Sequence, residues 1–287
     1  MKLNVQGEKM KIRSIILIAA QFLVLMATVG LIGDTLFAAD EPSAFEVMKK
    51  VEDRDDGDSS ISEMTMILLD RRGNKRVRKM KGYSKDFGKD SKSINFFLSP
   101  ADVRNTAFLS YNWDDENKED DNWLYLPALR KVKRISSGNK KDSFMGSDFS
   151  YADVNGLDTG DWEFKFLKKN EVVDGNDCWV IEAVPKKSKR KEVINETGYL
   201  KSISWIRKDN FISVKGKMYV KKGKKIKYFT ASNIEKIQGI WTVKKLSMVT
   251  TKGKRKEHAT VIQFDKLVYN KGVGDEMFTT QRMERGL

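Results

Sequence analysis

Cysteine and histidine are nearly absent from this sequence: among 287 residues, only Cys178 and His258 are of these types. A single cysteine cannot form an intramolecular disulfide, so the fold must be held together by its core. One histidine and one cysteine also cannot assemble a zinc site rich in these ligands. His258 lies in the charged segment KRKEHATV, and the chain contains no nucleophile-elbow sequence. We therefore expect no catalysis, no metal and no cofactor.

Proline and low-complexity sequence are also scarce. The chain has four prolines and no tract with the composition of an interdomain linker. The 248 residues from Asp40 to Leu287 are enough for one large domain with a substantial core. We predict a single domain over residues 40–287.

The N-terminus has the zones of an export signal. Basic residues, among them Lys2 and Arg13, precede an apolar run from Ile15 to about Gly33, and the small residues Ala38 and Ala39 come after it. This order predicts a signal peptide over residues 1–39 and a periplasmic protein. The run approaches the length that spans a bilayer, so a retained anchor stays open as the alternative.

The net charge is +14 for the whole chain and +12 without residues 1–39, which carry four basic and two acidic side chains. In an exported protein, this excess favours anionic lipid head groups or acidic envelope polymers over nucleic acid. The alternative is a solvated surface on which lysines protect exposed strand edges.

Periodicity predicts one helix and then many strands. A helix is expected from Pro42, with Phe45, Met48 and Val51 on its apolar face. Beyond it, about eleven segments have the composition of strands, separated by turns rich in Gly, Asn and Asp. The predicted strands include residues 93–99, 106–113, 122–129 and 195–206.

Such a series of hairpins predicts a mainly β (α+β) fold with one large antiparallel sheet. Because twist accumulates across many strands, the sheet must curl into a barrel or half-barrel. The Pro42 helix and the connections 100–104 and 144–154 are expected to cover the concave face. If they fill it incompletely, an apolar cavity remains.

The stretch from 121 to 154 combines aromatic side chains with a basic centre. Gly146 can act as a hinge there, with Ser147 or Asp148 capping the segment after it. We predict an apolar lid beside a cationic rim that contacts head groups or a partner. The predicted lid or lipid-binding residues are Trp123, Tyr125, Phe144, Met145, Phe149 and Tyr151, and the rim residues are Arg130, Lys131, Lys133 and Arg134. The alternative is that these aromatics close one end of an ordinary core.

Three motifs in this order resemble the outer-membrane lipoprotein-sorting proteins, a family related to LolA. They are PADVRNTAFLSYNW (100–113), NWLYLPALRKVKRISSGNKKDSFMGSDFSYADV (122–154) and DEMFTTQRM (275–283). One departure is Asn105, which stands where the family pattern has glycine.

The resemblance implies a half-open, curved antiparallel sheet with helical plugs on its concave face. It implies a monomeric periplasmic carrier of lipid or lipoprotein acyl chains that contacts membranes transiently and works with an RND/MMPL-type transporter. The alternative function is a non-catalytic envelope protein that binds an anionic polymer or a protein partner and carries no lipid. No nucleic acid is expected as a partner.

Overall fold

The computed structural model of the protein describes residues 41–115, 118–156 and 158–287. Residues Ser43–Leu287 form one compact unit. The predicted signal peptide or anchor lies outside the described residues. Among the residues that are described, no helix is both long enough and apolar enough to cross a membrane.

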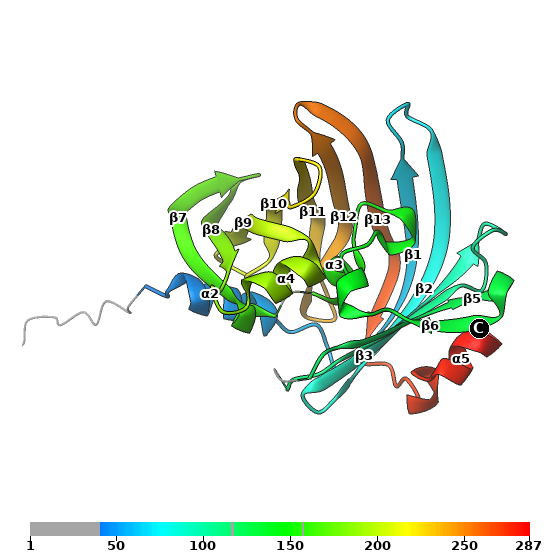
Figure 1. Cartoon of the computed structure of the whole chain (residues 1–287). Coiled ribbons are helices and arrows are strands. Elements are labelled where there is room, and N and C mark those ends of the chain that lie inside the picture. Colours follow the sequence, from blue (N-terminus) through cyan, green and yellow to red (C-terminus); the bar gives the residue numbers. More distant parts are fainter. Residues whose placement is uncertain (1–40, 116–117, 157) are drawn as a thin grey trace, which may run out of the picture. The chain divides into compact units, whose positions relative to one another are not determined.

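Thirteen antiparallel strands form one sheet in the order β6-β5-β4-β3-β2-β1-β13-β12-β11-β10-β9-β8-β7 (Figure 1). Every neighbouring pair is joined consecutively in sequence except β1 and β13, so the first and last strands meet in the middle of the sheet. The strands are β1 (Ser59–Leu69), β2 (Lys75–Phe87), β3 (Asp90–Ser99), β4 (Ala107–Asn112), β5 (Asp121–Leu126), β6 (Lys131–Arg134), β7 (Trp162–Val173), β8 (Asn176–Pro185), β9 (Tyr199–Arg207), β10 (Ser213–Val220), β11 (Lys225–Ile237), β12 (Ile240–Lys252) and β13 (Arg255–Tyr269).

The sheet is curved and does not close, because β6 and β7 form its two free edges. The predicted half-barrel fold is therefore confirmed, with thirteen strands where the sequence suggested about eleven. The helices are α2 (Ala44–Glu52), α3 (Tyr151–Asn155), α4 (Arg190–Thr197) and α5 (Thr280–Arg285), and short 3₁₀ turns are η1 (Pro127–Leu129), η2 (Ser137–Asn139), η3 (Phe144–Gly146), η4 (Thr159–Asp161) and η5 (Asp275–Met277).

Two predictions of local structure were wrong in detail. The segment expected to be a strand over 195–206 begins as the end of α4, which Gly198 terminates in the left-handed conformation before β9 starts. The first helix begins after Ser43, whose side chain forms a capping box with Glu46. It buries Ala44 and Val47, while Phe45 stays about half exposed.

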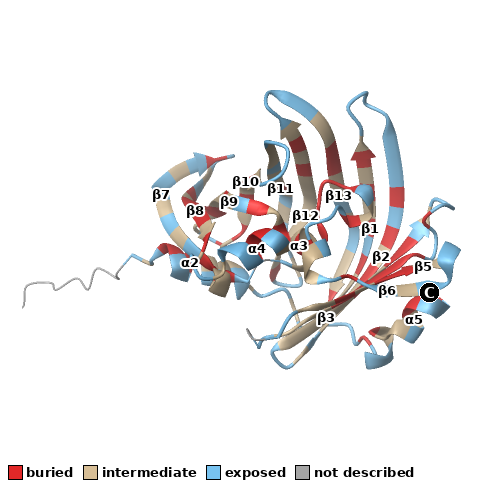
Figure 2. Cartoon of the chain, viewed as in Figure 1, coloured by how far each residue is buried: buried red, intermediate tan, exposed pale blue. Residues whose placement is uncertain are grey.

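The two faces of the sheet carry separate apolar cores, because side chains alternate along each strand. On β4, Phe108 packs on one face, whereas Ala107 and Leu109 pack on the other. We call the face bearing Phe108 the inner face, since α3 and its preceding turn lie on it, and the opposite one the outer face, which α5 covers (Figures 1 and 2).

Candidate functional site

A short segment folds over the inner face of the sheet, and we call residues 142–155 the lid. It contains η3 and α3, joined by an antiparallel bridge between Ser143 and Ser150. The chain reverses sharply because Met145 and Gly146 both adopt positive φ, at 51° and 74°. The predicted turn at Gly146 is thus present, but Ser150, and neither Ser147 nor Asp148, caps α3.

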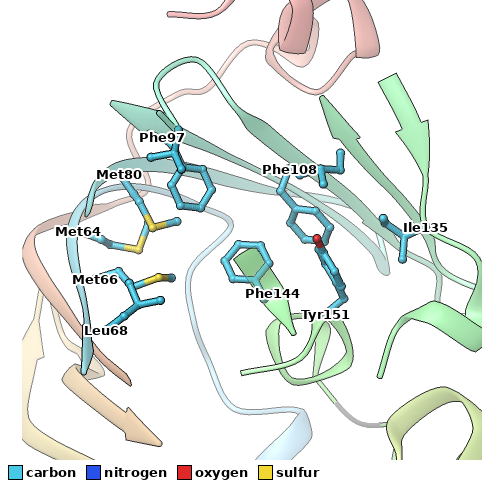
Figure 3. Packing of buried hydrophobic residues seen from close by; sticks show 11 residues of the cluster. Met64, Met66, Leu68, Met80, Phe97, Phe108, Ile135, Phe144 and Tyr151 are labelled. Carbon is cyan, nitrogen blue, oxygen red and sulfur yellow. The ribbon is translucent and has the colours of Figure 1, made fainter. Parts of the chain in front are cut away.

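The apolar side chains of the lid fill the space inside the curve. Phe144 is 2% exposed, and its ring lies 6.0 Å from Phe97, 5.3 Å from Phe108 and 5.5 Å from Tyr151, measured between centroids (Figure 3). Met145 packs at the margin of the same cluster. Phe149 enters a second inner cluster and packs with residues of β7, β9 and β12. The lid therefore contributes side chains to two neighbouring clusters on the inner face.

The structure does not bring all six predicted lid residues together. Trp123 and Tyr125 lie on the outer face, in the cluster that contains Phe278 and Met283 of the C-terminal segment. The strand face they share was predicted, but no local pattern indicated which face the lid would cover. Their neighbours Leu124 and Leu126 face the lid instead.

The buried carboxylate of Asp148 holds the turn of the lid against the sheet through hydrogen bonds. Asp148 is 2% exposed and accepts hydrogen bonds from Thr260 Oγ1 at 2.8 Å, from Thr250 Oγ1 and from His258 Nδ1. Its backbone N–H donates to Thr260 Oγ1 at 2.9 Å. Burial alone would raise the pKa of Asp148, but the hydrogen bonds from His258, Thr250 and Thr260 outweigh it and lower the pKa.

Three further polar contacts hold the lid, one at its turn and two at α3. The guanidinium of Arg78, on β2, donates to the carbonyl of Met145 and lies over the Phe97 ring. Desolvation lowers the pKa of Arg78. In α3, the Asp153 carboxylate accepts from Tyr199 Oη at 2.7 Å and from Lys227 Nζ at 3.2 Å. Burial, together with that carboxylate, raises the pKa of Tyr199 well above its ordinary value.

Beside the lid lies a cavity of about 560 Å³. Its apolar wall comes from Leu68, Leu69, Val220 and Ala259. Five basic and three acidic side chains also line the cavity. The basic ones are Arg71, Arg76, Lys141, Lys225 and Lys227, and the acidic ones are Asp70, Asp148 and Glu257. The volume is within the range of about 300–1,000 Å³ that is usual for small-molecule sites.

The polar groups of this cavity lack the arrangement of a nucleophilic triad. His258 Nδ1 contacts Asp148, but the hydroxyls of Ser143 and Ser147 donate to backbone carbonyls of the lid. A triad requires the hydroxyl to donate to the imidazole. Across residues 41–115, 118–156 and 158–287, no cluster of three or more His, Cys, Asp or Glu side chains could hold a metal ion.

The predicted cationic rim lies away from this cavity. Arg130 precedes β6 in a left-handed conformation, and Lys131 and Lys133 are exposed on that edge strand. Arg134 forms an ion pair with Asp121 of β5. This placement also suits the protective role of lysines on a free sheet edge.

Sequence reasoning missed the contact between Asp148 and His258, because 110 residues separate them. Arg78 and Thr260 were missed as well. The one signal was the aspartate itself, a charged residue within the apolar sequence SFMGSDFSY.

Comparison with known proteins places this geometry in a family. A family model described as an uncharacterized protein matches residues 89–285. A domain named as a candidate outer membrane lipoprotein-sorting protein, from Vibrio parahaemolyticus, is 31% identical with a TM-score of 0.74, over 84% of this chain and 98% of its own. A DUF1329 family protein from Desulfovibrio piger is 34% identical with a TM-score of 0.74, over 84% and 97%.

The chain belongs to this family of outer membrane lipoprotein-sorting and DUF1329 proteins. A LolA superfamily protein from Nitrosomonas europaea shares the fold at 19% identity and a TM-score of 0.62, over 84% of this chain and all of its own. A search of curated proteins finds no match. The resemblance inferred from the three motifs is therefore confirmed.

Proposed function

We propose that this protein is a periplasmic carrier that binds acyl chains of lipids or lipoproteins beneath the lid and catalyses no reaction. The observation that supports this most directly is the construction of the lid. Apolar side chains of the lid, above all Phe144 and Phe149, occupy the inner face of the sheet. An acyl chain that replaced them would keep the inner face buried, and burial of the chain itself would offset the exposure of the displaced side chains.

The anchors of the lid suit such an exchange. Asp148 and Arg78 hold the lid through directional polar contacts to the sheet, which are lost when the lid moves away from it. Met145 and Met66 provide flexible, polarisable surface around the site, which adapts to chains of different shape. We therefore assign Phe144, Met145, Phe149 and Tyr151 to the lid, with the Met145–Gly146 turn as its hinge.

The remaining parts of the proposal concern location and partners. Residues 1–39 act as a signal peptide, or as a retained anchor, that delivers residues 40–287 to the periplasm as one domain. The carrier works as a monomer and exchanges cargo with an RND/MMPL-type transporter. The names of the related proteins, which refer to lipoprotein sorting and LolA, support a carrier of this class.

Binding of a fluorescent fatty acid tests the proposal. If cargo enters only when the lid is open, weakening the closed lid must raise the apparent affinity, because affinity scales with the open fraction. The variant Asp148→Asn removes the buried charge and should tighten binding about 5- to 150-fold, corresponding to about 1–3 kcal/mol.

The matched control is Asp265→Asn, which makes the same chemical change at an exposed position of β13, where Asp265 pairs with Lys79. It should bind the fatty acid as the wild-type protein does. A wild-type protein that binds no fatty acid, even at low salt, would contradict the carrier and favour an envelope protein that binds an anionic polymer or protein.

A further inference from the structure

Three turns of the sheet hold most of the protein's excess positive charge. They are residues 70–76 between β1 and β2, residues 221–225 between β10 and β11, and residues 252–257 between β12 and β13, and we call them the tips. Their twelve cations are Arg71, Arg72, Lys75, Arg76, Lys221, Lys222, Lys224, Lys225, Lys252, Lys254, Arg255 and Lys256. With Asp70 and Glu257, the tips carry a net charge of +10, compared with +14 for the whole chain.

The tips emerge side by side at the same end of the sheet. Strands β2, β1, β13, β12, β11 and β10 are consecutive neighbours. Leu69 pairs with Ala259 and Lys225 pairs with Lys252, which brings the three turns to one end. Since strands are spaced by about 4.8 Å, the tips form a row about 24 Å long. Figure 1 shows the β1–β2 and β12–β13 turns projecting in the same direction.

Most of these cations have no acidic partner. Eleven of them are exposed, and the twelfth, Lys225, pairs with Glu257 at 2.8 Å. None of the other eleven forms an ion pair with any residue that the structure describes. Asp70 is engaged by its own turn, where it accepts from the backbone N–H groups of Arg72 and Asn74. The charge is therefore available to an external anion.

The composition of the tips favours a lipid surface over a protein. They contain no aromatic or aliphatic side chain. A protein interface requires an apolar or aromatic core, from which lysine is depleted. A bilayer with anionic lipids attracts clustered Lys and Arg without any such core. The tips also adjoin the cavity, because Arg71, Arg76 and Lys225 line it.

We propose that the three tips dock this protein onto the anionic surface of a lipid bilayer. Docking turns the cavity beside the lid toward the membrane, where cargo enters or leaves. The role of docking in cargo transfer rests on the proposed carrier function, whereas the docking itself is inferred from the charge and position of the tips. Binding is electrostatic and peripheral, since the tips have nothing apolar to insert.

Co-sedimentation with vesicles of phosphatidylcholine, with and without phosphatidylglycerol, tests the docking. The purified protein should bind only the anionic vesicles, and binding should weaken as salt rises from about 0.05 M to about 0.3 M. The variant Arg72→Gln/Lys222→Gln/Lys254→Gln removes one cation from each tip and none that lines the cavity. Each cation contributes about a five-fold factor, so the variant should bind on the order of 100-fold more weakly.

The matched control is Lys236→Gln/Lys266→Gln/Lys271→Gln, which removes the same charge from exposed positions near the ends of β11 and β13 opposite to the tips and should retain vesicle binding. An equal loss in the control would show that net charge alone matters, and would overturn the proposal. Tighter binding to soluble polyglutamate than to the anionic vesicles would overturn it in favour of a polymeric partner. Fatty-acid binding, measured separately, should be unchanged in the tip variant, so failure of docking and failure of the carrier function are distinguishable.

Discussion

The lid and the C-terminal segment cover opposite faces of the same sheet, and they are held in different ways. Both bury large apolar side chains: Phe144 of the lid on the inner face, Phe278 and Met283 on the outer face. The lid is fastened in addition by buried charged groups, Asp148 and Arg78. Among the residues that the structure describes, the C-terminal segment forms one ion pair, Lys85–Asp275, in which Asp275 is largely exposed. In addition, Tyr111 Oη donates to the carbonyl of Phe278.

This difference bears on the mobility of the two covers. A buried ion contributes little net stability, because desolvation offsets its attraction, but it fixes one position strongly. A cover that opens and returns to the same place benefits from such contacts, whereas a permanent cover requires only apolar packing. We therefore expect the lid to open locally and α5 to remain closed until the domain unfolds.

The largest expected effect is a difference in the free energy of unfolding between variants of the C-terminal segment and of the lid. Phe278→Ala should lower the free energy of unfolding by about 3–5 kcal/mol, because it leaves a cavity in the core of the outer face, which we expect to stay closed. Phe144→Ala removes a similar volume, but a lid that opens locally, as we propose, limits the global loss to the free energy of lid closure. Denaturant unfolding of both variants measures the difference. Equal losses would mean that the lid belongs to the cooperative core.

The second-largest effect is expected on the local opening of the lid, when the buried carboxylate of Asp148 is replaced. Asp148→Asn should accelerate amide hydrogen exchange in residues 143–150 by about 5- to 150-fold, since the closed lid loses about 1–3 kcal/mol. Exchange in α5 should not change. Asp265→Asn serves again as the control. If it accelerated exchange in residues 143–150 equally, the effect would not be specific to the contacts of Asp148.

Acid should open the lid before it affects the C-terminal cover. The pKa of Asp148 is lowered in the closed lid, so its stabilisation is complete above the ordinary aspartate pKa of about 4 and is lost as pH falls through the lowered value. The ratio of the exchange rate in Asp148→Asn to that in the wild type should therefore be constant above about pH 5 and fall toward one below about pH 4. A ratio that instead grew with acidity would contradict the assigned role of the carboxylate.

The smallest effect is expected at β6. Exchanging Lys131 and Lys133 for Gln should change stability by no more than about 0.5 kcal/mol, as is usual for exposed positions. Charge reversal of Arg130, Lys131, Lys133 and Arg134 tests the predicted contact with head groups or a partner. If fatty-acid binding and delivery to membranes stay unchanged in a folded variant, these residues only protect the edge of the sheet.

The sequence predicted those features that depend on local pattern. Alternating residues and turn composition indicated a curled antiparallel sheet, although the strand predicted over 122–129 ends at Leu126, before Pro127 begins η1. Gly146 marked the sharp turn of the lid, and Asn105, which stands where the resemblance led us to expect glycine, adopts a left-handed φ of 62°.

The features that sequence reasoning missed depend on pairing between distant strands. The faces of β5 were assigned, but only the position of α5, far later in the chain, decides that Trp123 and Tyr125 lie away from the lid. The contact of Asp148 with His258 likewise depends on the register of β12 and β13. The row of cationic tips forms only once β1 pairs with β13.

Native mass spectrometry of the purified protein, with organic extraction afterwards, tests the central claim most directly. We expect a stoichiometric adduct that contains acyl chains and is released by extraction. A protein that stays bare, even after incubation with envelope lipids, would contradict the carrier function and leave Phe144 and Phe149 as parts of an ordinary core.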